Sequence, residues 1–321
     1  MSDTVPSLSD PSEQRLTALA TGPQVADVTV IMPAHNGGAT IARALASVRS
    51  QTVQPAHVVV VDDGSEDDTA AAAREAGREL GLNLTILENE RSEGSGPSRN
   101  TAIQQATTRW VAFLDCDDEW RPDHLESSLL VADGKVLVTA PAVDSAGFPR
   151  GNVTGELMVL GPSRCFVPDN PVVTSATVVD RETVIRVGGF RPLRRAQDLD
   201  LWARVLEQGS GVARPSVAAT YHLHATPPNQ LSNDIDRACV MQILDAYADR
   251  AWMTRQVLDG CIGRMEWDDL RLAQRERRWK EAGRHASWFI RHPAALPGLV
   301  SMFRVRRRAR QVETVIQHFA R

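Results

Sequence analysis

The fold of the chain is indicated first by the stretch Val58-Val59-Val60-Val61-Asp62-Asp63-Gly64-Ser65. Four consecutive valines are typical of a strand that is covered on both faces, and the Asp-Gly pair behind them favours a tight turn. A similar unit lies just upstream, where the apolar run 28–32 leads into Asn36-Gly37-Gly38 and then into apolar residues at helical spacing up to Val48. Two strand, loop and helix units in succession indicate an α/β sheet.

Two further strands continue this pattern along the chain. Residues 84–87 and 110–114 are short apolar runs, and a helix is expected between them from about 98 to 106. Strands that alternate with helices in this way predict an α/β fold with a doubly wound, mainly parallel sheet. Because ligands bind such sheets beyond the carboxyl ends of the strands, we expect the functional residues in the loops that follow them.

The chain divides by composition into three parts. Residues 1–26 are rich in Ser, Pro, Asp and Thr and lack periodicity, so we expect a disordered lead-in. Residues 27–232 hold the predicted sheet domain, in which shorter strands follow from about Val136, among them 172–174 and 176–179. Residues 233–321 are predicted to form a helical, basic extension, with helices at about 233–259, 266–290 and 296–317.

The composition is that of a globular protein with an uneven charge. Of 321 residues, 42% are hydrophobic and 24% are charged, and the net charge is −4. Residues 271–321, however, hold thirteen Lys or Arg against three Glu. Such an end is able to contact an anionic lipid surface, an acidic subunit or nucleic acid, or it is only a solvated helical face. We predict peripheral membrane contact or self-association through these helices, and no nucleic-acid partner.

The cysteines indicate a reducing compartment. Cys116, Cys165, Cys239 and Cys261 show no CxxC or Cys/His spacing, and no apolar segment at the start of the chain precedes a cleavage site. No stretch reaches the roughly 18–20 apolar residues that a membrane-spanning helix requires. We therefore expect a cytoplasmic protein that does not cross a bilayer and is at most peripheral to one.

Three acids follow the last of the four strands directly, namely Asp115, Asp117 and Asp118. Two carboxylates spaced D-x-D at a strand end point into the ligand crevice, and hard anionic oxygens are what Mg²⁺ or Mn²⁺ prefers. We see no dense cluster of Lys or Arg near them, so a metal ion would neutralise the charge of a diphosphate leaving group. The alternative is that these acids only solubilise the turn or cap the helix that begins near Pro122.

Asp63, at the end of the second strand, and Arg99, at the start of the third helix, suggest a nucleoside pocket. The Asp63 carboxylate is able to accept from a base N–H or from ribose hydroxyls, and the Arg99 guanidinium to donate to a base or to a phosphate oxygen. The residues around Asp63 also satisfy a simple turn, in which Ser65 and Asp68 cap the next helix.

Taken together, these motifs resemble the family 2 glycosyltransferases, which have the GT-A fold. The matching stretches cover roughly residues 28–232 and are specific in their order and spacing: Val30-Ile31-Met32-Pro33-Ala34-His35-Asn36, Ser47-Val48-Arg49-Ser50-Gln51-Thr52, Val60-Val61-Asp62-Asp63-Gly64-Ser65, Ser98-Arg99-Asn100-Thr101-Ala102-Ile103, Phe113-Leu114-Asp115-Cys116-Asp117-Asp118-Glu119-Trp120, and Gly188-Gly189-Phe190 ahead of Gln197-Asp198-Leu199-Asp200-Leu201-Trp202.

The resemblance implies a nucleotide-sugar donor and assigns residues to it. By position, the nucleoside pocket would be lined by Pro33, His35 and Asn36, with His35 where a Tyr is more usual. Asp63 and Arg99 would contact the base.

The resemblance also assigns a metal site. Asp115 and Asp117 would hold the ribose and the metal, with Asp117 as the direct ligand of Mg²⁺ or Mn²⁺. His224 matches a position at which the family often has a histidine that helps to hold the metal or the diphosphate.

Asp198 aligns with the catalytic base of the family, a carboxylate in a Glu-Asp pair in which Gln197 here replaces the Glu. An acceptor hydroxyl has to lose its proton as it attacks the anomeric carbon, so a carboxylate is needed at this place. The alternative is that Asp198 or Asp200 only favours the positive end of a helix dipole.

The leading hypothesis is a metal-dependent inverting glycosyltransferase that moves a sugar to an acceptor hydroxyl. It requires acids from separate segments to converge, so that a metal ion and a proton acceptor flank one scissile bond. A nucleotidyltransferase is the second hypothesis, although residues 34–38 lack the basic residue expected in its first loop. The third is a non-catalytic nucleotide- or carbohydrate-binding protein of the same fold.

Overall fold

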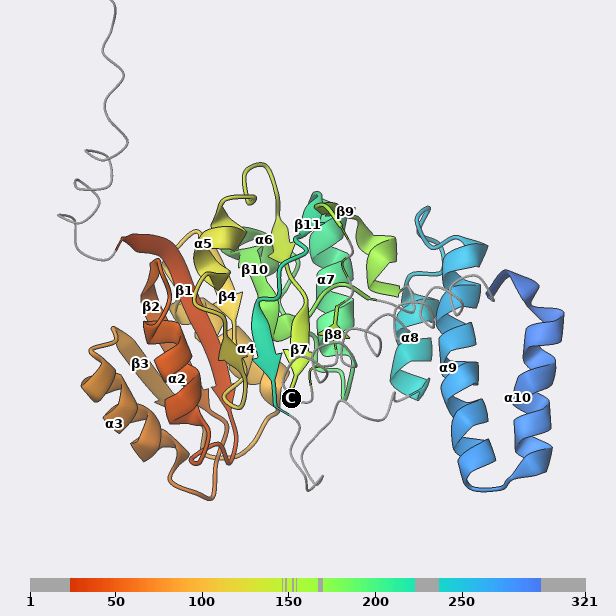
Figure 1. Cartoon of the computed structure of the whole chain (residues 1–321), viewed down its shortest axis with the longest axis horizontal. Coiled ribbons are helices and arrows are strands. Elements are labelled where there is room, and N and C mark those ends of the chain that lie inside the picture. The colour runs from red at the N-terminus through yellow and green to blue at the C-terminus, as the bar shows by residue number, and fades with distance from the viewer. Residues whose placement is uncertain are drawn as a thin grey trace, which may run out of the picture.

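The apolar runs of the sequence form one half of an eight-stranded sheet (Figure 1). The structure, a computed structural model, describes residues 24–145, 147, 149–151, 153, 155–166, 170–222 and 237–295. The strand order is β3-β2-β1-β4-β10-β6-β11-β9. The first four are all parallel: β1 (Val25–Ala34), β2 (Gln54–Asp62), β3 (Leu84–Glu88) and β4 (Trp110–Phe113).

The valine run of β2 is buried because its side chains alternate between two apolar layers. Val58 and Val60 belong to one cluster and Val59 and Val61 to another. The first cluster takes in helices α2 (Ile41–Arg49), α3 (Thr69–Leu80) and α5 (His124–Leu129). The second takes in α4 (Ser95–Gln105), α6 (Arg181–Arg186) and α7 (Gln197–Gln208). The prediction of a strand with helices on both faces is confirmed.

The turn between β2 and α3 differs from the sequence prediction in one detail. Asp68 occupies the N-cap position of α3, but its side chain makes no capping hydrogen bond. The Ser65 hydroxyl donates to Asp62 Oδ1 (2.5 Å) instead, and the Thr69 amide donates to Asp67 Oδ1 (3.0 Å). The predicted cap by Ser65 and Asp68 is therefore wrong, because the Ser65 hydroxyl is bound to Asp62 and to the Asn36 amide instead. The helix stops at Gly81, whose φ is 63°.

The second half of the sheet is mixed. β10 (Thr177–Asp180) runs antiparallel to both β4 and β6 (Leu137–Thr139), β11 (Gly211–Ala213) runs parallel to β6, and β9 (Met158–Leu160) forms the antiparallel edge. The strand expected at residues 172–174 is wrong, since Thr174–Ala176 form a 3-10 turn (η2) in which the Ala176 amide donates to Val173 O (2.9 Å). A second, four-stranded sheet follows the order β5 (Glu119–Trp120), β12 (Ala219–Tyr221), β7 (Ala142–Asp144), β8 (Pro149–Arg150).

The helices near the C-terminal end are shorter than predicted. They are α8 (Arg237–Ala246), α9 (Arg255–Arg275) and α10 (Trp279–Arg291). The 3-10 turn η3 (Pro293–Ala295) follows α10. An earlier 3-10 turn, η1 (Pro162–Phe166), lies beside α7 and α9. The expected helix 233–259 is interrupted because Trp252 and Met253 turn into the apolar cluster of α7, after which Thr254 caps α9 by accepting from the Val257 amide (3.4 Å).

Helices α8 and α9 share the core of the sheet domain. Val240, Ile243 and Leu244 of α8 and Met265 of α9 belong to the same buried cluster as the residues of α7. The predicted boundary at residue 232 and the helix expected at 296–317 lie outside the described residues, whereas β1 begins at Val25, within the predicted lead-in. Helix α8 and the part of α9 around Met265 are therefore packed onto the sheet domain, whereas α10 packs against α9 in a separate apolar cluster.

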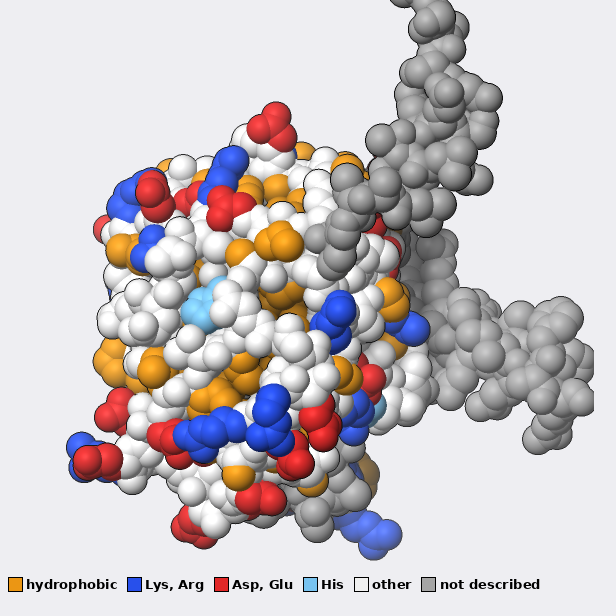
Figure 2. Space-filling view, turned by 90° about the vertical axis from the view of Figure 1, so that its left-hand side faces the viewer, with side chains coloured by type: hydrophobic (Ala, Val, Ile, Leu, Met, Phe, Trp, Pro, Cys, Tyr) orange, Lys and Arg blue, Asp and Glu red, His pale blue; other side chains and the backbone are white. Residues whose placement is uncertain are grey.

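Two surface properties bear on membrane contact: the apolar length of the helices, and the distribution of charge at the end of the molecule that carries β3 and α3. Among the described residues, none of the helices combines the length and the apolar composition needed to span a bilayer. Figure 2 shows that acidic and basic side chains are interspersed at this end of the molecule. Exposed pairs such as Arg74 and Glu88 account for part of this mixture.

Candidate active site

The loops after β1 and β2 are tied to each other at the carboxyl edge of the sheet. His35 Nδ1 lies 2.9 Å from the carbonyl oxygen of Asp63, and the Asn36 side-chain oxygen accepts from the Glu66 amide (2.8 Å). Asn36 has a φ of 52°, a left-handed conformation that Asn tolerates better than most residues. Pro33 is buried within β1, whereas the side chains of His35 and Asn36 are exposed, as a nucleoside-binding loop requires.

Asp63 holds the loop that leads into α4. Its carboxylate is 3% exposed and accepts five hydrogen bonds, from Asn89 Nδ2 (2.8 Å), Ser92 Oγ (2.7 Å), the amides of Glu93 (3.0 Å) and Gly94 (2.8 Å), and Ser98 Oγ (2.8 Å). Burial by itself raises the pKa of Asp63, but the hydrogen bonds outweigh it and lower the pKa to about 2. The predicted contact of Asp63 with a base stays a prediction, and its role in the described conformation is to order this loop.

Arg99 connects this loop with the acids after β4. Its guanidinium is buried (6% exposed), donates to Asp115 Oδ1 (2.5 Å) and to Ser95 Oγ (3.2 Å), and lies 5.4 Å from the centre of the Phe190 ring. The Gln197 side chain donates to the same Ser95 oxygen (2.9 Å). Two residues assigned separately to the donor, Arg99 and Asp115, are thus an ion pair.

The acids after β4 crowd one another. Asp118 is fully buried, and its pKa is raised to about 8 by burial and then by the neighbouring charges of Asp115 and Asp117. One oxygen of Asp118 accepts from the His222 amide (3.2 Å), and the other, Oδ2, has no hydrogen-bond partner among the described residues. Burial also raises the pKa of Cys116, between the acids, to about 12, which disfavours a thiolate nucleophile there.

Hard oxygen donors therefore fit a divalent cation at the end of β4. Mg²⁺ is commonly held by one or two carboxylates together with substrate phosphates, so Asp117, with or without Asp115, would supply the protein's share of the donor set and the substrate the rest. Within the described residues no three His, Cys, Asp or Glu side chains are grouped to hold a metal ion without a substrate. His224 lies outside the described residues.

His222 contacts the acidic loop after β4, whereas the sequence prediction had selected His224 for this part of the site. Its Nε2 lies 2.7 Å from Glu119 Oε1, which also pairs with Arg43 Nε (3.0 Å). The Arg43 guanidinium donates to the carbonyl oxygen of Asp117 (2.9 Å). The backbone of the acidic loop is thereby fixed from α2 and from the end of β12.

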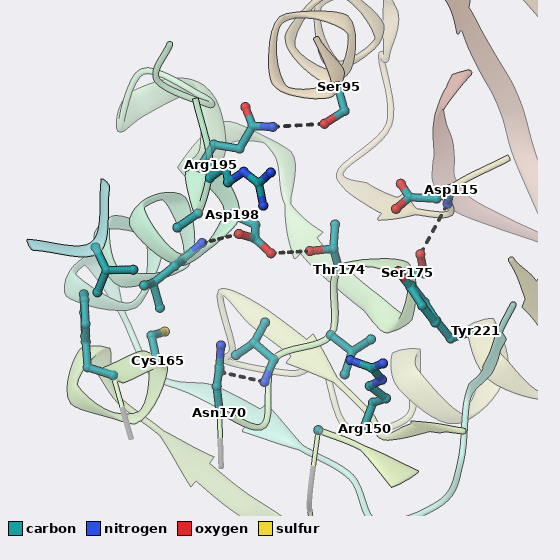
Figure 3. A pocket seen from close by; sticks show the side chains of 18 of the residues that line it. Ser95, Asp115, Arg150, Cys165, Asn170, Thr174, Ser175, Arg195, Asp198 and Tyr221 are labelled. Carbon is teal, nitrogen blue, oxygen red and sulfur yellow. Dashed lines mark hydrogen bonds between the residues drawn. The ribbon is translucent and has the colours of Figure 1, made fainter. Parts of the chain in front are cut away.

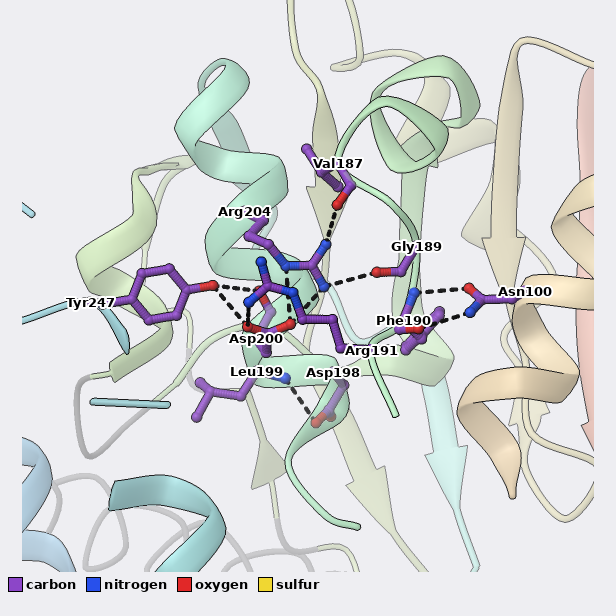
Figure 4. Close-up of polar contacts among 10 residues, drawn as sticks. All are labelled: Asn100, Val187, Gly189, Phe190, Arg191, Asp198, Leu199, Asp200, Arg204 and Tyr247. Carbon is purple, nitrogen blue, oxygen red and sulfur yellow. Dashed lines mark hydrogen bonds and ion pairs between the residues drawn. The ribbon is translucent and has the colours of Figure 1, made fainter. Parts of the chain in front are cut away.

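The two acids on the first turn of α7 have different surroundings (Figure 4). Asp200 is 2% exposed and is bound by Arg204 (2.6 Å), Arg191 (3.2 Å) and the Tyr247 hydroxyl (2.9 Å). Asp198 makes no ion pair with any other residue that the structure describes. It accepts from its neighbour's amide, Leu199 N (2.8 Å), and from Thr174 Oγ1 (3.2 Å).

Asp198 and the donor-side residues line one cavity of about 540 Å³ (Figure 3). Of the residues predicted for the site, Arg99, Asp115 and Asp198 are among its described lining residues. Pro33, His35, Asn36, Asp63 and Asp117 are not. This cavity therefore brings Asp115 and Asp198 together, but the predicted convergence of Asp63 and the metal acid Asp117 with Asp198 is not seen in it.

The cavity also contains arginines that the sequence reasoning missed. Five arginines line it: Arg99, Arg150, Arg194, Arg195 and Arg264. The expectation that no basic cluster lies near the acids is wrong, because β8, the loop before α7, and α9 bring these side chains together from distant parts of the chain. Spacing along the sequence carried no signal for this cluster.

A parallel half-sheet with acids at its carboxyl ends, joined to a mixed half that presents a carboxylate from a helix N-terminus, is the architecture of a GT-A nucleotide-sugar enzyme. Comparison with known proteins gives the family. Residues 29–200 match the family model of Glycosyl transferase family 2, and the chain belongs to this family. The resemblance drawn from the sequence motifs is confirmed.

Relatives and a solved structure agree with this assignment. The chain is 33% identical over 220 residues to the pre-mycofactocin glycosyltransferase of Mycobacterium tuberculosis (strain ATCC 25618 / H37Rv), a match that covers 64% of this chain and 44% of the relative. It therefore spans less than half the length of that protein. It is 28% identical to the succinoglycan biosynthesis protein ExoU of Rhizobium meliloti (strain 1021), with 85% of this chain and 86% of the relative covered.

The crystal structure of S. aureus TarS 1-349 in complex with UDP-GlcNAc matches with a TM-score of 0.62 at 19% identity, and covers 74% of this chain and 72% of that one. At this identity the likeness concerns the fold, and it confirms the predicted α/β fold of GT-A type with helices at its C-terminal end.

Proposed function

We propose that the chain is a metal-dependent inverting glycosyltransferase, which moves a sugar from a nucleoside-diphosphate donor to an acceptor hydroxyl. The observation that carries this proposal is that Asp115, paired with Arg99, and Asp198 line the same cavity. One carboxylate lies on the donor side and the other at the start of α7, with room for a substrate between them. Membership in family 2 supports the reaction class.

The donor would lie at the carboxyl edge of β1, β2 and β4. Its nucleoside would contact the loops that carry Pro33, His35 and Asn36, and Arg99 and Asp115 would donate and accept at the base and ribose. Asp63 would contact the base in place of one of its present hydrogen bonds, or act only by ordering the loop before α4. The bound sugar nucleotide named for TarS makes uridine diphosphate sugars the first donors to test.

The metal ion, Mg²⁺ or Mn²⁺, would be held by Asp117 with the neighbouring carboxylates, and by His224 if that side chain reaches it. When bound, it supplies positive charge that stabilises a departing diphosphate. In support of this, the pKa of Asp118 is raised first by burial and then by the neighbouring negative charges of Asp115 and Asp117.

Asp198 would act as the general base. The acceptor hydroxyl gives its proton to the carboxylate while its oxygen forms the bond to the anomeric carbon, and the bond from that carbon to the diphosphate oxygen breaks on the opposite side. The Thr174 hydroxyl and the Leu199 amide orient the carboxylate for this transfer. Base assistance of this kind contributes about 10²–10⁴ in rate.

Donor turnover tests the proposal. Sugar nucleotides are incubated with the full-length protein and Mn²⁺, and the released products are identified. The proposal expects slow release of a nucleoside diphosphate without acceptor. Release of pyrophosphate would indicate a nucleotidyltransferase, and no release with any donor, despite binding, a non-catalytic protein.

The metal site is tested by thermal shift with nucleoside diphosphates. A ligand at 100 times its dissociation constant adds about 2.7 kcal/mol of stability, which is easily seen in Tm. The Mn²⁺-dependent part of this shift is expected to disappear with EDTA and in Asp117→Ala, and to persist in Asp133→Ala, a matched change at an exposed acid. Nucleotide affinity that ignores both EDTA and Asp117→Ala contradicts the metal site.

A cytoplasmic location, with peripheral membrane contact or self-association through the basic end, remains part of the proposal. Its support is that all four cysteines are free, as a reducing compartment favours. The Arg-rich residues from 304 onward lie outside the described part of the chain.

A further inference from the structure

The turn η2 lies between the two carboxylates that line the cavity. Thr174 Oγ1 donates a hydrogen bond to Asp198 Oδ2 (3.2 Å), and the next residue, Ser175, accepts one at its Oγ from the Asp115 amide (3.3 Å). Figure 3 shows Asp198 and Asp115 on opposite sides of this pair of residues. Two consecutive residues therefore join the proposed general base to the start of the acidic loop after β4 (residues 115–118).

A buried indole ties the same turn to the segment that follows the acidic loop. Trp120, on β5, is 4% exposed, and its Nε1 donates to the Ser175 carbonyl oxygen (2.6 Å). The place of Trp120 is set by α2 and α5, because its amide donates to Ser47 Oγ (3.1 Å) and its ring centre lies 4.7 Å from that of His124. Ser175, itself buried, is thus contacted from both ends of the acidic loop.

The turn is short and anchored to the sheet, so that its residues shift together. The Thr177 hydroxyl donates to the Val173 carbonyl oxygen (2.7 Å) and thereby closes the turn across η2. The Val173 amide donates to Thr139 Oγ1 on β6 (3.3 Å). Thr174 and Ser175 lie inside this closed segment, so a displacement of Ser175 is carried to Thr174.

We infer that η2 is a positioning element of the proposed reaction, which sets Asp198 relative to the acidic loop through Trp120, Ser175 and Thr174 in series. The inference rests on the proposed function, because it concerns the same site. Trp120 is not among the described residues that line the cavity, and its indole acts on the base through the turn. A misplacement of about 1 Å costs a reaction about 10² in rate, so loss of a contact in this series has a measurable effect.

Hydrolysis of the sugar nucleotide, with water as the acceptor, tests the last contact of the series. Asp198 takes a proton from the water, whose oxygen bonds to the anomeric carbon as the bond to the diphosphate breaks. Thr174→Val removes the hydroxyl and keeps the branched shape. Because this hydroxyl contacts the base, kcat should fall about tenfold, while the KM of the donor stays within about twofold of wild type. Thr174→Ser should restore most of the turnover. Thr85→Val, at a half-buried threonine of β3 whose hydroxyl lies 2.9 Å from His57 Nε2, should leave both constants unchanged.

A double-mutant cycle tests the series itself. Trp120→Phe removes the indole N–H and keeps an aromatic ring, and it should lower kcat in a protein that retains Thr174. The same change should have little further effect in the Thr174→Val background, because the indole reaches the base through that hydroxyl. Trp110→Phe, at a buried tryptophan of β4, is the control and should change kcat by less than about twofold in either background.

Hydrogen exchange gives a readout that does not need turnover. In the full-length protein, Trp120→Phe should raise amide exchange in residues 174–176 and also in residues 197–201 at the start of α7, because a loosened turn lets both segments open more often. Residues 84–88 of β3 should exchange as in wild type, which shows that the variant remains folded.

The inference would be overturned by any of four results: wild-type kcat in Thr174→Val or in Trp120→Phe, a kcat in Thr174→Ser as low as in Thr174→Val, effects of Trp120→Phe and Thr174→Val that multiply, or unchanged exchange at residues 197–201 in Trp120→Phe. Failure of the proposed function would be seen separately, as no hydrolysis of any sugar nucleotide by the wild-type protein. The hydrogen exchange of Trp120→Phe still decides the inference in that case.

Discussion

The half of the molecule that we propose binds the donor (the donor half, β1 to β4 with their loops) and the half that we propose binds the acceptor (the acceptor half, around α7) are built in different ways. In the donor half, β1 to β4 deliver their residues in consecutive loops, and one buried carboxylate, Asp63, organises the loop before α4 through five hydrogen bonds. In the acceptor half, the cavity is assembled from η2, α7, β8 and α9, which are far apart in the sequence. The donor site thus depends on local loop structure, and the acceptor site on tertiary packing.

The first turn of α7 shows how the acceptor half is held. Asp200 points into a network of Arg191, Arg204 and Tyr247, which joins α7 to the segment after α8, while Asp198 is left for the cavity. Arg204 also donates to the carbonyl oxygens of Val187 and Gly189, and so fixes the chain between α6 and α7. The position of Asp198 therefore rests on a structural acid two residues away.

The largest effect on stability is expected for Asp200→Ala. Removing one partner of a buried ion pair leaves the arginines uncompensated, which costs about 3–5 kcal/mol of unfolding free energy. Chemical denaturation measures this change, with Asp133→Ala at an exposed site as the control. A loss below about 1 kcal/mol would show that the network does not hold the acceptor half.

A smaller loss is expected for Asp63→Asn in the donor half. The lowered pKa of Asp63, about 2 against a usual 3.8, is equivalent to about 2 kcal/mol of stability from its carboxylate. Because the folded-state pKa is the lower one, this contribution is fully present above about pH 4 and is lost as the pH falls toward 2. The stability difference between wild type and Asp63→Asn should therefore shrink below pH 4, and a constant difference from pH 6 to pH 2.5 would contradict the assignment.

The smallest effect on stability is expected for a change at Ala196, just before the proposed general base Asp198. Ala196 has a φ of 55°, a conformation that is unfavourable for any residue with a Cβ, directly before Gln197 and Asp198. Ala196→Gly should relieve this strain and raise stability by up to about 1 kcal/mol, seen as a small rise in Tm. A fall in Tm would show that Ala196 is not strained in the folded protein.

The difference between local loop structure and tertiary packing also determines which features could be predicted from the sequence. The valine run at 58–61, the Asp-Gly turn and the acids at 115–118 are local signals, and each lies in the predicted strand or loop. Two features were not predicted from the sequence: the end of α8 at Ala246 and the turn at Thr174–Ala176. They depend on packing against Tyr247 and α7 rather than on periodicity.

Within the site, the contacts between distant segments could not be predicted from the sequence. Asp198 was identified through a family motif, and the structure adds that Asp200, on the same helical turn, is bound by Arg204, Arg191 and Tyr247 instead. The five arginines of the cavity are dispersed from residue 99 to residue 264, and the contact of His222 with Glu119 joins two loops. No rule based on sequence spacing predicts such contacts.

The most direct test of the account is the turnover of Asp198→Asn, measured with the donor identified by nucleotide release and an acceptor that the wild-type protein glycosylates. The account predicts a loss of about 10²–10⁴ in kcat, with nucleoside-diphosphate binding and unfolding free energy close to those of wild type and of the Asp133→Asn control. Turnover equal to wild type in Asp198→Asn would contradict the claim that this carboxylate takes the proton of the acceptor.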